Sequence, residues 1–216
     1  MLTLARFPAA ASGLWVTLYW GTVLVKAIRL SRKIGKDPNV LPREKTGLIL
    51  RMIWFPTIIA WCTLPWIAVL RGFSGYWLWR SLWPMMWPAE LLGAVAAAAG
   101  FVAFVLTLAC WRQMGRSWRI GIDPGERTEM IVHGAYQWVR HPIYTLSIVL
   151  MITTLLAVPT PLMLAVACVH IVLITLESLR EERYMQKIHG ESYNAYRRRT
   201  GRFIPRWMGT PRRDGV

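Results

Sequence analysis

Two clusters of polar residues border the apolar runs in the C-terminal half of the chain. Arg140-His141-Pro142-Ile143-Tyr144-Thr145 stands just before one apolar run, and Glu181-Glu182 follows the end of the next. If the two runs form an antiparallel helical hairpin, both clusters lie at the same mouth of it. Charge beside lipid is costly unless it is used or paired. The clusters are therefore the first candidates for a functional site.

The first cluster has the features of an anion site. Pro142 suits the first position of a helix, because its missing N–H is not needed there. The free N–H groups and the positive dipole end of that helix would lie near Arg140 and His141, a place that suits a carboxylate. The alternative is a capped interfacial helix with a snorkelling arginine and an anchoring tyrosine.

The second cluster places acidic groups on one helix face. Glu177, Glu181 and Tyr184 recur at i, i+4 and i+7 and so share that face. The alternative is that these carboxylates form salt bridges to Arg180, Arg183 or the basic tail. Together, the two clusters supply carboxylates, a histidine, two tyrosines and an arginine, a set that suits a zwitterionic ligand with a fixed cation.

The elements that must position these clusters are membrane helices. The chain has 216 residues, 55% of them hydrophobic, which fits an integral membrane protein better than a soluble domain. We predict a single all-α domain, a polytopic membrane helical bundle, with N-terminal helices in 1–88 and a cofactor-binding core in 89–216. The five predicted membrane segments cover about 14–30, 48–70, 89–111, 142–158 and 162–176.

The last two predicted segments form a hairpin and differ from the others in length. Both are short against the roughly 20 residues that a spanning helix needs, so they need neighbouring turns or local bilayer thinning. Val158-Pro159-Thr160-Pro161 is a compact turn between them. The final segment is expected to continue as a polar helix and a cytosolic helical tail.

Basic residues predict the orientation of the bundle. Most of the 26 Lys and Arg residues lie after the first segment, between the third and fourth segments, or in the tail. With five segments these stretches share one face, which places the N-terminus outside and the C-terminus in the cytosol. Both polar clusters then face the cytosol, where a water-soluble cofactor can reach them. The composition fits a bacterial inner membrane.

Several classes of function are disfavoured by the sequence. The net charge is +15, but no basic stretch is interleaved with a nucleic-acid-binding motif, so we expect no nucleic-acid partner. Cys62, Cys110 and Cys168 are far apart and form neither a CxxC pair nor a disulfide framework. The four histidines show no metal-ligand spacing, and we predict no metal.

The ordered set of motifs resembles the isoprenylcysteine carboxyl methyltransferase and phospholipid methyltransferase superfamily of membrane enzymes. The resemblance covers about residues 110–206. The matching residues are Gly134-Ala135-Tyr136, Arg140-His141-Pro142-Ile143-Tyr144, Glu181-Glu182, Gly190, Tyr193, Tyr196 and Arg202-Phe203-Ile204-Pro205.

This resemblance implies a cofactor, S-adenosylmethionine, bound near the cytosolic face. A tunnel between helices would admit a lipophilic small molecule or lipid as the acceptor from the bilayer. By the same resemblance, Glu181 would hold a polar part of the cofactor and Glu182 would support the site. The implied cofactor-binding residues are Thr128, Glu129, Met130, Ile131, Tyr136, His141, Pro142, Ile143, Tyr144 and Glu181.

Three positions depart from the family pattern. Leu146 stands where a glycine is frequent, and Ala135 replaces the proline of the usual Gly-Pro-Tyr. Glu177 stands where the isoprenylcysteine enzymes carry an arginine that is associated with substrate handling. This acid puts a prenylcysteine carboxylate acceptor in doubt, so a carboxylate, amine, thiol or hydroxyl acceptor remains open.

Methyl transfer from a sulfonium is a direct displacement, so the expected catalytic residues act mainly by positioning and desolvation. An amine, phenol or thiol acceptor would need proton removal, which Glu181, Glu182 or His141 can supply. Arg140 can pair with the methionine carboxylate. The faces of Tyr136 and Tyr144 can lie against the sulfonium.

The sequence is also compatible with two other functions. One is a membrane reductase of the sterol-reductase type that uses NADPH, and the other is a non-catalytic lipid-binding membrane protein. The oligomeric state is also open. His170, inside an apolar segment, is expected to be hydrogen-bonded between helices, and the run 197–199 of arginines is expected to contact anionic lipid.

Overall fold

The computed structural model describes residues 6–35, 37, 40–42, 44–73, 76–82, 87–115 and 130–206, with the side chains of residues 34 and 87–90 left aside. Within these ranges the protein is all-α. Short 3-10 turns, η2 (Trp77–Trp79) and η4 (Gly134–Gln137), lie between the long helices. The five α-helices are α1 (Phe7–Ile34), α2 (Lys45–Arg71), α3 (Trp87–Met114), α4 (Pro142–Ala157) and α5 (Pro161–Arg199).

Four of these helices, α1, α2, α3 and α5, are long and apolar enough to span a membrane. Less than half of each apolar stretch is buried inside the protein, and many large apolar side chains point outward, as lipid-facing side chains do. The fourth helix, α4, is apolar but has only 16 residues, about 24 Å at 1.5 Å per residue. The protein is therefore an integral membrane protein with four candidate spans and one shorter apolar helix.

The helices lie where the apolar runs predicted them but extend further at their ends. The first helix begins at Phe7 and ends at Ile34, where Gly35 caps it in a left-handed conformation with φ 67°. The last helix continues from the apolar part, which ends near Leu176, through the polar segment as far as Arg199. Hydropathy marks the membrane-facing part of a helix, whereas backbone hydrogen bonding carries the helix on into water.

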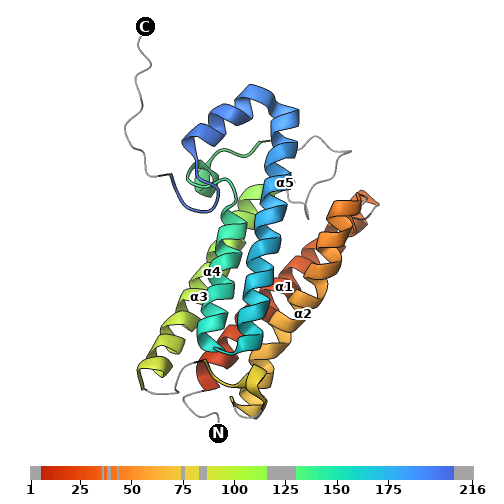
Figure 1. Cartoon of the computed structure of the whole chain (residues 1–216). Coiled ribbons are helices and arrows are strands. Elements are labelled where there is room, and N and C mark those ends of the chain that lie inside the picture. The colour runs from red at the N-terminus through yellow and green to blue at the C-terminus, as the bar shows by residue number, and fades with distance from the viewer. Residues whose placement is uncertain are drawn as a thin grey trace.

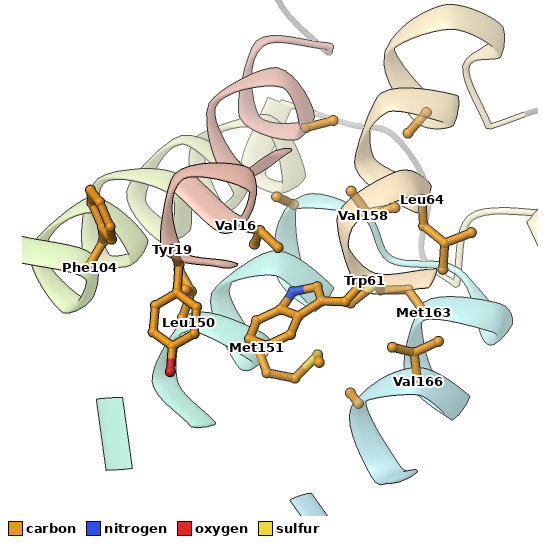
Figure 2. Packing of buried hydrophobic residues seen from close by; sticks show 14 of the residues in the cluster. Val16, Tyr19, Trp61, Leu64, Phe104, Leu150, Met151, Val158, Met163 and Val166 are labelled. Atoms are coloured by element: carbon orange, nitrogen blue, oxygen red, sulfur yellow. The ribbon is translucent and has the colours of Figure 1, made fainter. Parts of the chain in front are cut away.

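The helices pack as a bundle along one long axis, with α1 beside α2 and α3 beside α4 (Figure 1). The core centres on the buried indole of Trp61 in α2, which lies among Val16 of α1, Met151 of α4 and Met163 of α5 (Figure 2). Its Nε1 donates a hydrogen bond of 3.1 Å to Oγ1 of Thr154. One side chain thus fixes α2 against the α4–α5 hairpin by both packing and polarity.

His170 of α5 makes a second polar link in the bundle. Nε1 of Trp54 donates to its Nδ1 at 3.3 Å, and Oγ of Ser147 lies 3.1 Å from its Nε2. These partners belong to α2 and α4, so the expectation that His170 is hydrogen-bonded between helices is confirmed. Both ring nitrogens are satisfied, which a buried imidazole requires.

The turn between α4 and α5 forms as the sequence predicts. Thr160 caps α5 by accepting a hydrogen bond of 3.1 Å from the backbone N–H of Met163. Pro161 occupies an early position of that helix, where its missing N–H costs nothing. The turn holds the two helices antiparallel, so the start of α4 lies beside the far part of α5 (Figure 1).

We predict that His170→Ala destabilises the protein by about 1–2 kcal/mol, because it leaves Trp54 and Ser147 without their partner inside the membrane. The measurement is the thermal unfolding midpoint in detergent. Cys168→Ala is the matched control, since Cys168 is exposed on the same helix. Equal midpoints for the two variants would contradict this role of His170.

Candidate active site

The start of α4 and the middle of α5 bring three predicted residues together. The hydroxyl of Tyr144 donates to Oε1 of Glu181 at 2.5 Å. Nδ1 of His141 lies 3.4 Å from Oε2 of the same carboxylate. The His141 and Tyr144 rings are stacked, with centroids 5.5 Å apart and an angle of 11° between their planes. Pro142 is buried and Ile143 half-buried at the start of this helix.

Glu182 is the centre of a separate ion cluster, which we call the Glu182 clamp: Arg140, Glu182 and Arg202. Nε and Nη2 of Arg140 each lie 3.0 Å from Oε1 of Glu182. Arg202 donates through Nε to Oε1 at 2.9 Å and through Nη2 to Oε2 at 3.0 Å. Two arginines, one just before α4 and one just after α5, therefore share one carboxylate.

The backbone after α5 returns to the start of α4 and brings Arg202 with it. The backbone N–H of Arg140 donates to the carbonyl of Gly201 at 2.8 Å, and that of His141 donates to the carbonyl of Arg202 at 3.2 Å. Oγ1 of Thr145 donates to the carbonyl of Phe203 at 2.9 Å. This returning segment, 200–203, is thus hydrogen-bonded along the entrance to α4.

Two glycines make the return feasible. Gly190 has φ 53° and ψ −124° inside α5, a left-handed conformation that suits glycine, and the helix changes direction there (Figure 1). At Gly201, a Cβ atom would collide with the carbonyl oxygen of Ile204. Gly190 belongs to the motif set that the sequence singled out, whereas Gly201 directly precedes the Arg202-Phe203-Ile204-Pro205 motif.

The two neighbouring glutamates have different electrostatic surroundings. Both lie beyond the apolar part of α5. Burial alone would raise the pKa of Glu182, but His141, Arg202 and Arg140 together hold it well below its usual range. The side chain of Glu182 is only 5% exposed, against 24% for Glu181. Glu182 therefore stays an anion inside the protein, whereas Glu181 is within reach of a ligand.

His141 is held between these carboxylates. Burial alone would lower its pKa, but hydrogen bonding and charge from Glu181 and Glu182 raise the pKa above the ordinary value for histidine. The imidazole is therefore biased toward its protonated form, which can face a carboxylate on each side.

The remaining predicted residues lie nearby or outside the described part. Tyr136 is buried in η4, where its carbonyl accepts a hydrogen bond of 2.6 Å from the hydroxyl of Tyr196. It also interacts electrostatically with Glu181. Met130 and Ile131 are half-buried just ahead of this turn. Thr128 and Glu129 lie outside the described residues.

Glu177 belongs to an ion cluster next to the site. Arg180 forms ion pairs with both Glu177 of its own helix and Glu44, which precedes α2. The interpretation of Glu177 as a salt-bridge partner of Arg180 is thus confirmed. The carboxylate is almost fully buried, so its charge is matched locally at the junction of α2 and α5.

Arg51 of α2 is a site-lining residue that the sequence analysis did not single out. Its guanidinium lies 5.3 Å from the ring centroid of Trp54, and its charge interacts with Glu177, Tyr144 and Glu181. Only 7% of the residue is exposed. The signal in the sequence that points to such a residue is a lone arginine about two turns inside an apolar helix.

No three His, Cys, Asp or Glu side chains in the described ranges come together as a metal ion would require.

We predict that Glu182→Gln destabilises the protein by about 3 kcal/mol, because it leaves two partly buried arginines without their counter-charge. The contribution of the wild-type carboxylate is present above about pH 4.3, the ordinary pKa of glutamate, and is lost as the pH falls through its lower folded pKa. The measurement is the difference in thermal unfolding midpoint between the wild type and Glu182→Gln, followed from pH 7 to pH 3.

The control for this prediction is Glu191→Gln, which removes an exposed ion pair with Arg198 and should change the midpoint little. If Glu182→Gln unfolds at the same temperature as Glu191→Gln at pH 7, the Glu182 clamp does not stabilise the fold.

Comparison with known proteins covers α3, α4 and most of α5. Residues 91–192 match the family model described as phospholipid methyltransferase. Neither a curated protein nor a solved structure matches the chain. The matched range runs from α3 through α4 into the polar part of α5, and it contains His141, Tyr144, Glu181 and Glu182.

The family match confirms the resemblance drawn from the motifs, and enzymes of this family use S-adenosylmethionine. The chain therefore contains a phospholipid methyltransferase family domain and is an integral membrane methyltransferase that depends on S-adenosylmethionine.

Proposed function

We propose that this enzyme methylates a lipid-like acceptor at the cytosolic mouth of the α4–α5 hairpin. The observation that carries the proposal is the meeting of His141, Tyr144 and Glu181 where the apolar helices end. A site at this boundary can take a cofactor from water and an acceptor from the bilayer. The family match over residues 91–192 supports a lipid as the acceptor.

The residues at this mouth fit S-adenosylmethionine. Among the described side chains, Nε2 of His141 is buried without a hydrogen-bond partner, and Oε1 of Glu182 lies 3.4 Å from it. None of the described side chains caps the N-terminus of α4, and such a helix start favours a carboxylate. The half-exposed carboxylate of Glu181 can accept from hydroxyl or ammonium groups.

When bound, the cofactor supplies a methyl group already activated on a sulfonium. The protein has to hold that cation and exclude water from it. The stacked rings of His141 and Tyr144 lie on the wall of the site, and an aromatic face such as that of Tyr144 favours a cation. We assign Thr128, Glu129, Met130, Ile131 and Tyr136 to the same pocket by the family resemblance.

Glu181 is the group best placed to move a proton. It is more exposed than Glu182, and the Tyr144 hydroxyl fixes the direction of its carboxylate. Glu182 is a poor base, because two arginines and His141 hold its pKa well below its usual range. An amine, thiol or hydroxyl acceptor would give its proton to Glu181, whereas a carboxylate acceptor would need no base.

Arg140 and Glu182 act in this proposal as positioning residues. The guanidinium of Arg140 is engaged with Glu182 and with the carbonyl of Thr200. This geometry favours a structural role for Arg140 over a contact with the methionine carboxylate. The Glu182 clamp sets the position of the backbone on which His141 begins α4.

We assign the cofactor-binding core to residues 89–216 and a wall of the acceptor path to the helices of 1–88. The position of Arg51 supports this division, because α2 brings its charge to the same mouth as Glu181. The proposed topology has five crossings, the N-terminus outside and the C-terminus in the cytosol of a bacterial cell. The pairing of Glu177 with Arg180 does not favour a prenylcysteine carboxylate acceptor.

We predict that S-adenosylhomocysteine binds the detergent-purified enzyme with micromolar affinity in calorimetric titrations. Glu181→Ala and His141→Ala should each weaken binding at least tenfold, since each removes a charged partner. Tyr144→Phe should weaken it less, by about fivefold, because it removes one hydrogen bond. Glu191→Ala is the control and should bind as the wild type does.

Other outcomes of this titration separate the competing functions. Binding of NADPH with no binding of S-adenosylhomocysteine would favour the sterol-reductase type of enzyme. A well-folded protein that binds neither compound would be the non-catalytic lipid-binding protein.

We also predict the class of the acceptor. Incubation of wild-type membranes with S-adenosylmethionine labelled in its methyl group should place the label in the organic phase after lipid extraction. Membranes that contain the Glu181→Gln variant should give at least a hundredfold less label in the organic phase, as expected for loss of a general base. Label found in protein and not in lipid would overturn a lipid-like acceptor while leaving methyl transfer intact.

A further inference from the structure

The part of α5 beyond Gly190 forms a surface separate from the methyl-transfer site. This C-terminal arm, residues 191–206, leaves the bundle axis at the kink and folds back toward the start of α4 (Figure 1). Within the arm, Tyr193 and Tyr196 are buried, whereas Arg197 and Arg198 are exposed. The arm therefore presents one face to the enzyme and a basic face to its surroundings.

A pocket of about 260 Å³ lies in the basic face of the arm. It is lined by Asn194, Arg197, Arg198 and Arg206. The first three belong to the last turns of α5, and Arg206 comes from the chain that follows the returning segment. The sequence predicted a lipid contact for the run 197–199, but it did not indicate that Asn194 and Arg206 complete a pocket with two of those arginines.

Hydrogen bonds fix the shape of this pocket. Arg206 donates through Nη1 to the backbone carbonyl of Arg198 at 2.6 Å and to that of Arg197 at 3.5 Å. Glu191 accepts from Nη2 of Arg198 at 2.7 Å and from Nδ2 of Asn194 at 3.2 Å. One carboxylate thus orients the polar lining, and three guanidinium groups against that one acid leave the pocket positively charged.

The side chains that line the pocket favour a phosphate group as the ligand. Guanidinium groups bind phosphate oxygens with two parallel hydrogen bonds, and an amide such as that of Asn194 can donate a further one. The volume exceeds that of a phosphate group, so the pocket can also take part of the molecule that carries it. Both a phospholipid headgroup and a soluble phosphate would satisfy this chemistry.

The surroundings of the pocket favour a lipid as the source of the phosphate. Ile204 is 79% exposed, two residues before Arg206 and next to the returning segment at the start of α4. Exposed apolar side chains beside basic ones are typical of segments that lie in the membrane interface. Arg202 and Phe203, just before Ile204, are held to His141 and Thr145, so the position of the arm relative to the bundle is fixed.

We propose that the pocket of the C-terminal arm binds the phosphate of an anionic phospholipid, as a bound lipid distinct from the methyl acceptor. Ile204 would enter the interface beside it. The lipid would hold the arm whose other face supplies Arg202 to the Glu182 clamp. This site does not depend on the proposed methyl transfer, because none of its lining residues takes part in that chemistry.

The test is titration of the full-length enzyme, in micelles that contain phosphatidylcholine, with phosphatidylglycerol or inorganic phosphate. Binding is measured by the shift in thermal unfolding midpoint. Phosphatidylglycerol should stabilise the wild type in a salt-dependent way. The double variant Arg197→Gln/Arg198→Gln should bind it about 30-fold more weakly, because each basic side chain contributes about fivefold near an anionic surface.

The matched control is Arg183→Gln/Lys187→Gln, which removes two exposed charges from the same helix before the kink and should keep wild-type affinity. Both double variants should unfold like the wild type in phosphatidylcholine alone, which shows that they are folded. Ile204→Ser should weaken binding of the lipid but not of inorganic phosphate.

Three results would overturn the proposal. The first is an equal loss of lipid affinity in both double variants, which would mean a general charge effect. The second is stabilisation by inorganic phosphate at the concentration at which phosphatidylglycerol acts, which would mean a soluble ligand. The third is a lack of any difference between phosphatidylglycerol and phosphatidylcholine. S-adenosylhomocysteine titration of the same variants keeps this result separate from the methyltransferase proposal.

Discussion

The structure of the site depends on the burial of one negative charge. Glu182 has almost no exposed surface, and an ion in that position must be paired within the protein. Its two arginine partners lie on either side of α5 in the sequence, Arg140 before α4 and Arg202 after the last helix. The chain brings both to one carboxylate by turning at Gly190 and returning to the start of α4. The path of the C-terminal arm therefore places the second counter-charge of Glu182.

Adjacent residues in a helix point about 100° apart, and this geometry divides the work of the two glutamates. Glu182 faces the returning segment and is held as an anion by guanidinium groups. Glu181 faces the start of α4, where Tyr144 and His141 reach it and solvent is still accessible. His141 lies between the two carboxylates and couples them. A motif of two identical residues thus supplies one buried, paired carboxylate and one carboxylate that a ligand can reach.

The helices and the meeting of the two clusters could be predicted from the sequence, because both follow from local signals. Apolar run length located the helices, and Pro161 with its turn implied an antiparallel hairpin that brings His141 near Glu181. The roles of Arg140, Arg202 and Arg51 could not be predicted in this way. Their partners are distant in sequence, and an exposed basic residue has the same appearance in a sequence as a buried one. Hydropathy also underestimated the lengths of α1 and α5, which begin as early as Phe7 and end as late as Arg199, respectively.

The hydrogen bonds between the returning segment and the start of α4 set an order of biosynthetic assembly. A chain is made from its N-terminus, so Arg140 and His141 emerge long before Gly201 and Arg202. Until the later segment is synthesised, the backbone N–H groups of Arg140 and His141 lack these acceptors, and Glu182 lacks one of its two arginines. Membrane insertion of the helices can precede this closure, but completion of the Glu182 clamp cannot. The contacts around Glu182 and the start of α4 are therefore among the last that the growing chain can complete.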